Sequence, residues 1–390
     1  METLTAIKTL YSHLICSKSG KKYDKNVLQT YSELNKPLLA QFDLAQGLDK
    51  SILLDRPKNL WRYREVLPVE HDENIVSLGE GFTPILPLDS IRKLLDINNL
   101  YLKDEAYNPT GSFKARGQAM AISKAKELGV KKCVIPTAGN AGGAMSAYCA
   151  KAGLEAHVFM PVATPEIFKK ECEYFGAKVT LINGSIRDCA LKINEVRESD
   201  WFDISTLKEP FRLEGKKTMG YEIAEQMDWQ LPDVIIYPTG GGTGLIGIWK
   251  AFDEMEQLGW IGSERPRMVV VQAEACYPIV KAFKENKYIA EPFQNPAETI
   301  ANGLRVPAAF GDELMLQILY ESEGTALTVS ELEMLESLRE MAQQEGILLA
   351  PEGAATYAAL KQLIARQWIC PDDKVLLINT GSAYKYMENL

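Results

Sequence analysis

Lys114 is of a type, and stands in a place, that could form a covalent bond with a carbonyl compound. It follows the turn 108–111, Asn-Pro-Thr-Gly, where proline fixes φ and glycine accepts unusual backbone angles. The apolar spacing after the turn predicts a helix that extends to Gly129, with Ser112 as its N-cap. The positive end of a helix disfavours a cation, so a lysine in the first turn loses its proton more readily. A neutral amine is the form that attacks a carbonyl, although a solvated lysine at a helix start is the simpler interpretation of Lys114 alone.

Two other loops carry polar or small residues directly after apolar runs that we predict to be strands. The loop 137–142, Thr-Ala-Gly-Asn-Ala-Gly, precedes a predicted helix, and its small residues would let backbone N–H groups approach a carboxylate. The loop 379–382, Asn-Thr-Gly-Ser, follows the last predicted strand and is uninformative by itself. Ligands of open α/β sheets bind beyond the carboxyl ends of the strands, so both loops are candidates for a binding site. A simple glycine turn remains the alternative for 137–142.

A third loop, residues 238–244, has the sequence Pro-Thr-Gly-Gly-Gly-Thr-Gly and follows the apolar run Val-Ile-Ile-Tyr. Three consecutive glycines leave their N–H groups open to hold a dianionic phosphate, and the following helix adds its positive end. The loop is not a Walker loop, because no Gly-Lys-Ser/Thr follows, and it lacks the Gly-x-Gly-x-x-Gly spacing of dinucleotide sites. We interpret it as a phosphate cup; a flexible loop without a ligand is the alternative.

Residues 108–117 resemble the lysine motif of the fold type II pyridoxal-phosphate enzymes, and the four loops follow the order of that family. The resemblance extends over residues 60–390. It implies that Lys114 holds pyridoxal 5'-phosphate through the cofactor aldehyde, that Asn140 bonds the ring hydroxyl, and that the Thr380 hydroxyl faces the pyridine nitrogen. The expected cofactor-binding residues are Lys114, Asn140, Gly240, Gly241, Gly242, Thr243, Gly244 and Thr380. The expected substrate-binding residues are Thr110, Ser112, Thr137, Ala138, Gly139, Arg212 and Lys217.

The segment 211–218, Phe-Arg-Leu-Glu-Gly-Lys-Lys-Thr, most specifically resembles the threonine synthases. Its basic side chains could face a substrate phosphate, and an exposed basic helix start is the alternative. The resemblance implies conversion of O-phospho-L-homoserine and water to L-threonine and phosphate. Two positions depart from the subfamily pattern: Lys216 replaces the usual glutamine, and Ala115 replaces an aspartate, as in the dehydratases. A serine or threonine dehydratase, or another β-replacement enzyme, is therefore the alternative, without a C-terminal regulatory domain because the chain ends soon after Thr380.

Apolar strands alternate with helices from residue 133 onward, which predicts an α/β protein with two doubly wound open-sheet domains. We expect an N-terminal arm over 1–60, an α/β domain carrying the lysine over 61–205, and a second α/β domain carrying the phosphate loop over 206–390. The arm has Cys16 and Ser19 where some threonine synthases carry paired zinc ligands, so we expect it to hold no metal.

The overall composition argues against several classes of function. A net charge of −9 disfavours a general nucleic-acid or anionic-membrane surface, and no apolar run is long enough to span a membrane. Seven scattered cysteines without a Cys-x-x-Cys pair fit free thiols, and the first residues lack a signal-peptide pattern, so we expect a cytoplasmic protein. The expected partner is a small amino-acid substrate. The family resemblance implies a homodimer.

Overall fold

The computed structural model describes residues 8–389. They form two compact units, each assembled from three separate stretches of chain. Unit 1 comprises the described residues up to 82 together with 114–219 and 253–260. Unit 2 comprises 83–113, 220–252 and the described residues from 261 onward. The first five residues, on which the expectation of no signal peptide depends, lie outside the described part of the chain.

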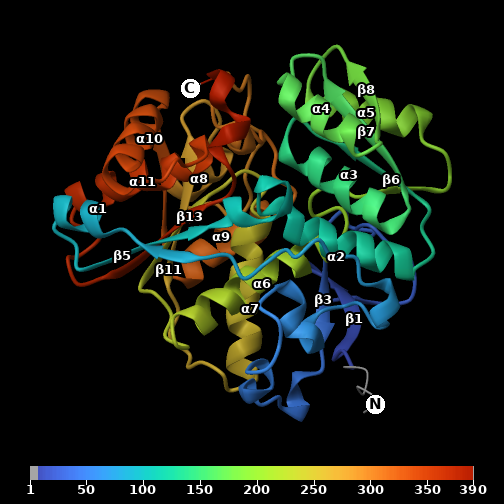
Figure 1. The fold of residues 1–390 in the computed structure, drawn as a ribbon, viewed down its shortest axis with the longest axis horizontal. Coiled ribbons are helices and arrows are strands. Elements are labelled where there is room, and N and C mark those ends of the chain that lie inside the picture. The colour runs from blue at the N-terminus through green and yellow to red at the C-terminus, as the bar shows by residue number, and fades with distance from the viewer. Residues whose placement is uncertain (1–7, 390) are drawn as a thin grey trace. The chain divides into compact units, whose positions relative to one another are not determined.

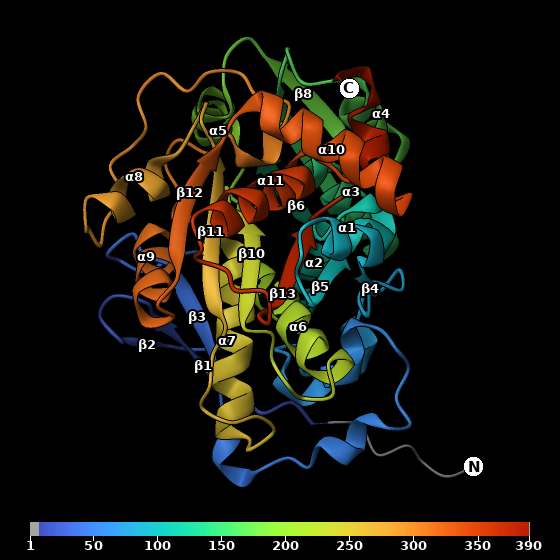
Figure 2. The same ribbon diagram turned by 90° about the vertical axis from the view of Figure 1, so that its left-hand side faces the viewer.

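Unit 2 is built on a six-stranded sheet with the order β12-β11-β10-β13-β5-β4. The strands are parallel except β4, which pairs with β5 in the antiparallel sense (Figure 2). Their bounds are β4 Ile85–Pro87, β5 Asn99–Asp104, β10 Val234–Pro238, β11 Arg267–Ala273, β12 Thr325–Val329 and β13 Lys374–Asn379. The helices of this unit are α1 Asp89–Leu94, α8 Pro278–Lys284, α9 Asp312–Glu321, α10 Glu331–Glu345 and α11 Pro351–Ala365. The near-continuous apolar strands are those expected of a parallel sheet covered on both faces.

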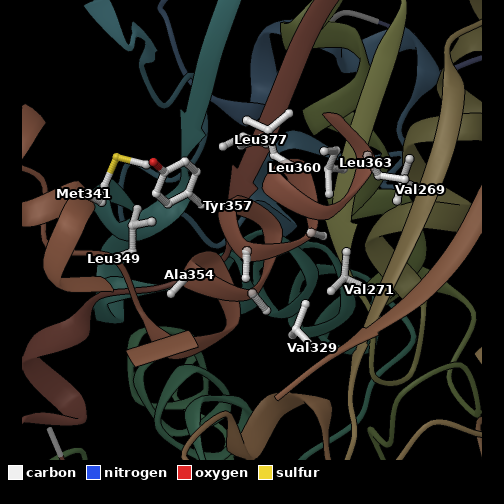
Figure 3. Packing of buried hydrophobic residues seen from close by; sticks show 14 of the residues in the cluster. Val269, Val271, Val329, Met341, Leu349, Ala354, Tyr357, Leu360, Leu363 and Leu377 are labelled. Carbon is white, nitrogen blue, oxygen red and sulfur yellow. The ribbon is translucent and has the colours of Figure 1, made fainter. Parts of the chain in front are cut away.

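The core of unit 2 lies between the sheet and helix α11. Val269 and Val271 from β11 and Leu377 from β13 face Leu360 and Leu363 of α11 (Figure 3). Tyr357 of the same helix lies beside Met341 of α10, so the cluster continues to the outer helix. Burial of a side chain of this size stabilises the fold by about 1.5–3 kcal/mol, so this core fixes the sheet from which the loops of unit 2 project.

Unit 1 contains two smaller sheets. The four-stranded parallel sheet has the order β8-β7-β6-β9, and a three-stranded antiparallel sheet of the N-terminal arm has the order β2-β1-β3 (Figure 1). The strands are β1 Tyr11–Cys16, β2 Lys22–Tyr23, β3 Leu38–Phe42, β6 Lys132–Pro136, β7 Glu155–Pro161, β8 Lys178–Ile182 and β9 Trp201–Asp203. The helices are α2 Lys114–Glu127, α3 Asn140–Ala152, α4 Glu166–Tyr174 and α5 Ile186–Val196. Helices α6 Phe211–Gln226 and α7 Thr243–Gln257 each contribute to both units.

The division into units differs from the three contiguous domains expected above. Strand β5 pairs with β13, 275 residues further along the chain between Asp104 and Asn379, so the stretch 83–113 joins the C-terminal half. Strand β9 occupies part of the segment 201–210, in which the sequence predicts the break between the two α/β domains. The arm forms a sheet of its own and packs Tyr11 and Leu14 against Phe211 and Met120 of unit 1.

The described residues contain no helix that is long and apolar enough to cross a membrane. Within residues 8–389, no group of three or more histidine, cysteine or acidic side chains is arranged to hold a metal ion. In the arm, the Cys16 thiol donates a hydrogen bond of 3.2 Å to Ser32 Oγ.

Candidate active site

Three of the predicted loops follow neighbouring strands of unit 2. The strand order β10-β13-β5 places side by side the loops that begin at Thr239, Thr380 and Glu105. Because the three strands are parallel, their carboxyl ends meet at the same edge of the sheet, where ligands of open α/β folds bind. The predicted phosphate loop, the C-terminal loop and the turn before Lys114 are thus brought together within one unit.

The turn before Lys114 is fixed to the loop after β13. Ser112 forms a β-bridge with Gly381, the Phe113 N–H donates to the Thr380 carbonyl at 3.0 Å, and Lys114 is the next residue. Helix α2 begins at Lys114, so the lysine stands in its first turn as predicted. The prediction that Ser112 caps this helix is wrong, because the helix begins two residues later and the Ser112 hydroxyl makes no hydrogen bond among the described residues. The buried hydroxyls of Thr110 and Ser112 have no hydrogen-bond partner among the described residues and so suit a ligand.

The glycine loop is shaped by close packing within unit 2. A Cβ atom on Gly244 would overlap the Tyr237 hydroxyl, and one on Gly240 would overlap the Gly303 carbonyl, so glycine is required at both positions. Helix α7 starts at Thr243 and has 15 residues, and the first N–H groups of a helix have no intrahelical acceptor. This loop can therefore hold an anion in the way expected of a phosphate cup.

Two buried polar side chains that sequence reasoning missed support the glycine loop. Gln272 Nε2 donates to the Thr239 carbonyl at 3.2 Å, while its Oε1 accepts the N–H groups of Ile279 and Val280. Glu352 Oε1 accepts the Gly303 N–H at 2.7 Å, which fixes the segment behind the loop. A polar residue closing the otherwise apolar run Met-Val-Val-Val-Gln was the available signal for Gln272.

Unit 1 carries Lys114 and the loop before α3. Helices α2 and α3 pack against each other, and α3 begins at Asn140, directly after Thr137, Ala138 and Gly139. The N–H of Gly139 donates to Thr137 Oγ1 at 3.3 Å, which folds this loop over the start of α3. Lys114 is half-buried, and so are Ala138 and Gly139. The structure therefore puts a lysine and an open helix N-terminus in one unit.

Glu80, from the glycine turn 79–81, is another supporting residue. Its carboxylate is fully buried and accepts hydrogen bonds from the Tyr148 hydroxyl at 2.6 Å, Trp61 Nε1 at 2.8 Å and the Leu78 N–H at 2.8 Å. Burial and the adjacent Glu80 carboxylate raise the pKa of Tyr148, which keeps that phenol a hydrogen-bond donor. Because Tyr148 is on α3, Glu80 ties this helix to the start of the chain.

Helices α2 and α6 cross at a point where glycine is required. A Cβ atom on Gly215 would overlap the Arg116 carbonyl, and one on Gly117 would lie 3.0 Å from the Arg212 carbonyl oxygen and 3.3 Å from Lys216 Cε. Two glycines, one from each of the motifs recognised in the sequence, thus allow the helices to meet. This crossing places the α6 basic residues beside the helix that begins at Lys114.

Arg212 and Lys216 are both buried at this crossing, which excludes the alternative of an exposed basic helix start. Arg212 Nη1 donates to the Ile204 carbonyl at 2.7 Å, whereas Nε and Nη2 have no hydrogen-bond partner among residues 8–389. Burial lowers the pKa of Arg212 to about 10. Burial, followed by the charges of Lys114 and Arg212, lowers the pKa of Lys216 well below its ordinary value. Unpartnered buried N–H groups of this kind are expected where an anionic ligand binds.

Lys217, the residue after Lys216, forms ion pairs with two buried carboxylates. Its ammonium group lies 2.6 Å from Glu214 Oε2 and 2.9 Å from Glu254 Oε2, and it donates to the Val66 carbonyl at 2.7 Å. It also lies 3.9 Å from the centre of the Phe42 ring. Three oxygen acceptors account for the three N–H donors of an ammonium group. The contacts of Lys217 are therefore those of a structural ion pair.

Each unit by itself carries donors that suit chemical groups of pyridoxal phosphate. A glycine-rich helix start suits its phosphate, the Thr380 hydroxyl suits a ring nitrogen, and the Lys114 amine suits its aldehyde. The two buried hydroxyls without partners, Thr110 and Ser112, lie in the same loop set and could take a further polar group. The residues present thus fit this cofactor.

Comparison with known proteins gives the same assignment. Residues 76–381 match the model of the family described as "Pyridoxal-phosphate dependent enzyme". A threonine synthase of Methanocaldococcus jannaschii is 35% identical over 95% of this chain and 92% of its own length, and one of Methanosarcina acetivorans is 35% identical over 96% and 92%. Among solved structures, a T.th. threonine deaminase is similar with a TM-score of 0.62 and 25% identity, over 77% of this chain and 92% of that one. The predicted fold type II architecture and cofactor are confirmed: this chain belongs to the family of pyridoxal-phosphate dependent enzymes.

Proposed function

We propose that the protein is a threonine synthase, a lyase that converts O-phospho-L-homoserine and water to L-threonine and phosphate. Three relatives named threonine synthase are 33–35% identical to this chain over 84–96% of its length, which supports the proposal. The substrate of this reaction carries both an amino-acid head and a phosphate on its side chain. The site must therefore hold two anionic groups besides the cofactor phosphate.

The observation that carries the proposal is the buried guanidinium of Arg212, whose nitrogens Nε and Nη2 have no hydrogen-bond partner among the described residues. The glycine loop of unit 2 already suits the cofactor phosphate, so the unsatisfied donors of Arg212 in unit 1 suit a second anion. The Glu209 and Asp203 carboxylates act on the charge of Arg212, but the uncharged side chains of serine and threonine would leave its buried Nε and Nη2 without hydrogen-bond acceptors. A phosphate on the substrate side chain would accept hydrogen bonds from both Nε and Nη2.

In this proposal Lys114 first holds the cofactor and, once the substrate has displaced it, moves protons at Cα and Cβ. The cofactor, when bound, supplies the electron-withdrawing ring that makes those hydrogens acidic. Arg212 binds the side-chain phosphate, which leaves from Cγ, and water adds at Cβ. The N–H groups at the start of α3, around Gly139 and Asn140, suit the substrate carboxylate. The neutral hydroxyl of Thr380 would leave the ring nitrogen unprotonated, which favours elimination and replacement over transamination.

A dehydratase is the second candidate, and one residue favours it. Ala115, fully buried in the first turn of α2, matches the dehydratases at a position where threonine synthases usually have aspartate. An L-serine ammonia-lyase of Rhizomucor miehei shares the fold, with a TM-score of 0.66 and 20% identity. This second enzyme would remove water from serine or threonine with the same lysine.

The test is to incubate the purified holoenzyme with O-phospho-L-homoserine and to quantify threonine by mass spectrometry together with free phosphate. Equal amounts of threonine and phosphate are expected. Parallel reactions with serine and threonine should yield no ammonia at a comparable rate. Rapid ammonia release from serine or threonine, with no threonine formed from the phosphorylated substrate, would replace the synthase with the dehydratase.

A further inference from the structure

The C-terminal segment 383–386, Ala-Tyr-Lys-Tyr, is a part of unit 2 that the proposed mechanism leaves unused. It follows the loop after β13 and lies in the same unit as the glycine loop and the turn 108–111. Within this segment Tyr386 is 4% exposed and Lys385 is half-buried, whereas Tyr384 is 77% exposed. The side chains of Lys385 and Tyr386 are therefore the ones that pack against the rest of unit 2.

Lys385 holds the turn that precedes Lys114. Its Nζ donates to the Thr110 carbonyl at 2.7 Å, and the Ser382 N–H donates to the Gly111 carbonyl at 2.8 Å. Thr110 has a φ of +59°, a left-handed conformation that a β-branched residue rarely adopts. A strained residue of this kind persists only where the surrounding groups hold it in place. The hydrogen bond from Lys385 therefore stabilises the strained turn that leads into Lys114.

Tyr386 acts on the glycine loop through Glu352 and Gly303. Its hydroxyl donates to Glu352 Oε1 at 3.1 Å, and the same oxygen accepts the Gly303 N–H at 2.7 Å. The Gly303 carbonyl packs directly against Gly240, where a Cβ atom would overlap it. A Cβ atom on Gly303 itself would lie 2.7 Å from Glu352 Oε1, so Gly303 fits closely between the carboxylate and the glycine loop. Close-packed groups transmit a displacement, so the position of Glu352 affects the position of Gly240.

We propose that Lys385 and Tyr386 are positioning residues for pyridoxal phosphate: Lys385 holds the turn that leads into Lys114, and Tyr386 holds the glycine loop suited to the phosphate. Neither side chain needs to touch the cofactor, since each acts through a backbone group that it fixes. Because both residues belong to one short segment, the two loops are anchored at a common point of unit 2. The inference depends on the cofactor that the family of this chain implies, and not on the proposed reaction.

The affinity for two forms of the cofactor tests this inference. The cofactor is removed from the purified holoenzyme with hydroxylamine, and the protein is then titrated with pyridoxal phosphate or with pyridoxal, which keeps the aldehyde and lacks the phosphate. Binding is followed by absorbance. The test variants are Tyr386→Phe, which removes only a hydroxyl, and Lys385→Met, which keeps most of the side-chain volume. The matched controls are Tyr384→Phe, at the exposed tyrosine of the same segment, and Lys93→Met, at an exposed lysine of α1.

Tyr386→Phe should bind pyridoxal phosphate roughly tenfold more weakly than wild type, because Glu352 loses a hydrogen bond and holds the glycine loop less firmly. Its affinity for pyridoxal should be unchanged, because pyridoxal has no phosphate to place in that loop. Lys385→Met should weaken the binding of both compounds by a similar factor, because the turn before Lys114 serves the aldehyde that they share. Lys385→Arg, which keeps a donor at this position, should restore most of the lost affinity, and both controls should bind like wild type.

A contact that only stabilises the fold would give a different pattern. Tyr386→Phe would then weaken the binding of pyridoxal and pyridoxal phosphate alike, or neither, and either result would overturn the role of Tyr386. Wild-type affinity of Lys385→Met for both compounds would overturn the role of Lys385. None of these results decides the proposed function, which is judged by threonine formation from O-phospho-L-homoserine at saturating cofactor.

Discussion

Replacing Lys217 with methionine should destabilise the protein strongly while leaving the reacting groups in place. The lysine is the counter-charge of two buried carboxylates, Glu214 at 2.6 Å and Glu254 at 2.9 Å, and the side chains of Lys217 and Glu214 are both completely inaccessible to solvent. Methionine has a similar volume and would fill the site beside the Phe42 ring. The change therefore removes the charge and leaves the packing nearly intact.

The magnitude follows from the burial of the carboxylates that remain. Breaking a buried ion pair by removing one partner typically costs about 3–5 kcal/mol, because the other charge stays buried without compensation. Each 1.4 kcal/mol is about a factor of ten in the folding equilibrium, so the loss corresponds to roughly two to three and a half orders of magnitude. An exposed ion pair such as Lys192 and Glu195 on α5 contributes only about 0.3–0.5 kcal/mol to the free energy of unfolding.

Urea unfolding followed by far-ultraviolet circular dichroism is the assay. Lys217→Met should unfold at a much lower urea concentration than wild type, and the control Lys192→Met should unfold close to wild type. If Lys217→Met does not fold, Glu254→Gln provides the graded test, since it leaves Lys217 paired with Glu214 and should cost less. Unfolding of Lys217→Met at the wild-type midpoint, together with a raised KM for O-phospho-L-homoserine, would refute this reasoning and assign Lys217 to the substrate.

Three other predictions concern Gly215, Glu209 and Lys114. Gly215→Ala should lower the free energy of unfolding by about 1–3 kcal/mol and should lower activity, because the added methyl group pushes α2 away from α6. The control Gly262→Ala, with open space around the residue, should unfold like wild type in the same urea assay. Burial raises the pKa of Glu209 from 4.5 to about 7, so the protonated form favours folding, and stability should fall by roughly 3 kcal/mol as pH rises from 4.5 to 7. Urea unfolding midpoints measured between pH 4.5 and 7 should fall with rising pH in the wild type and should not show this fall in Glu209→Gln. Lys114→Ala should lose the yellow absorbance of bound cofactor after gel filtration, and a variant that stays yellow would contradict covalent attachment at Lys114.

The sequence predicted those elements whose signal is local. The sequence predicts a strand over 178–182 and helices over 141–152 and 186–198, and β8, α3 and α5 match these ranges to within two residues. Each is a short apolar or periodic segment bounded by turn residues. Strand β12 was missed, since its sequence Thr-Ala-Leu-Thr-Val mixes hydroxyl and small residues without a clear apolar run. The division into units could not be predicted either, because it depends on β5 pairing with a strand at the far end of the chain.

The same limit applies to the site. Lys216 and Lys217 look alike in the sequence, and both were candidates for contacting a phosphate. Successive residues on an α-helix point about 100° apart, so only one of them can face α2. Lys216 packs toward Gly117, whereas Lys217 pairs with Glu214 and Glu254. Which of two adjacent lysines faces a ligand depends on the neighbouring helix, and that information is not local.

In the proposed function, the position of Lys114 would allow one residue to act on both the cofactor and the substrate. The chain passes from unit 2 to unit 1 between Phe113 and Lys114, and Phe113 is hydrogen-bonded to the Thr380 carbonyl at 3.0 Å. Lys114 is therefore covalently adjacent to the loops suited to the cofactor, and it also begins the helix that crosses α6 at Gly215, beside Arg212. If the proposed function holds, a substitution at this crossing should raise the KM for O-phospho-L-homoserine more than it weakens binding of the cofactor. Substitutions in the glycine loop 240–244 should have the opposite effect, since that loop and its supports, Gln272 and Glu352, belong to unit 2 alone.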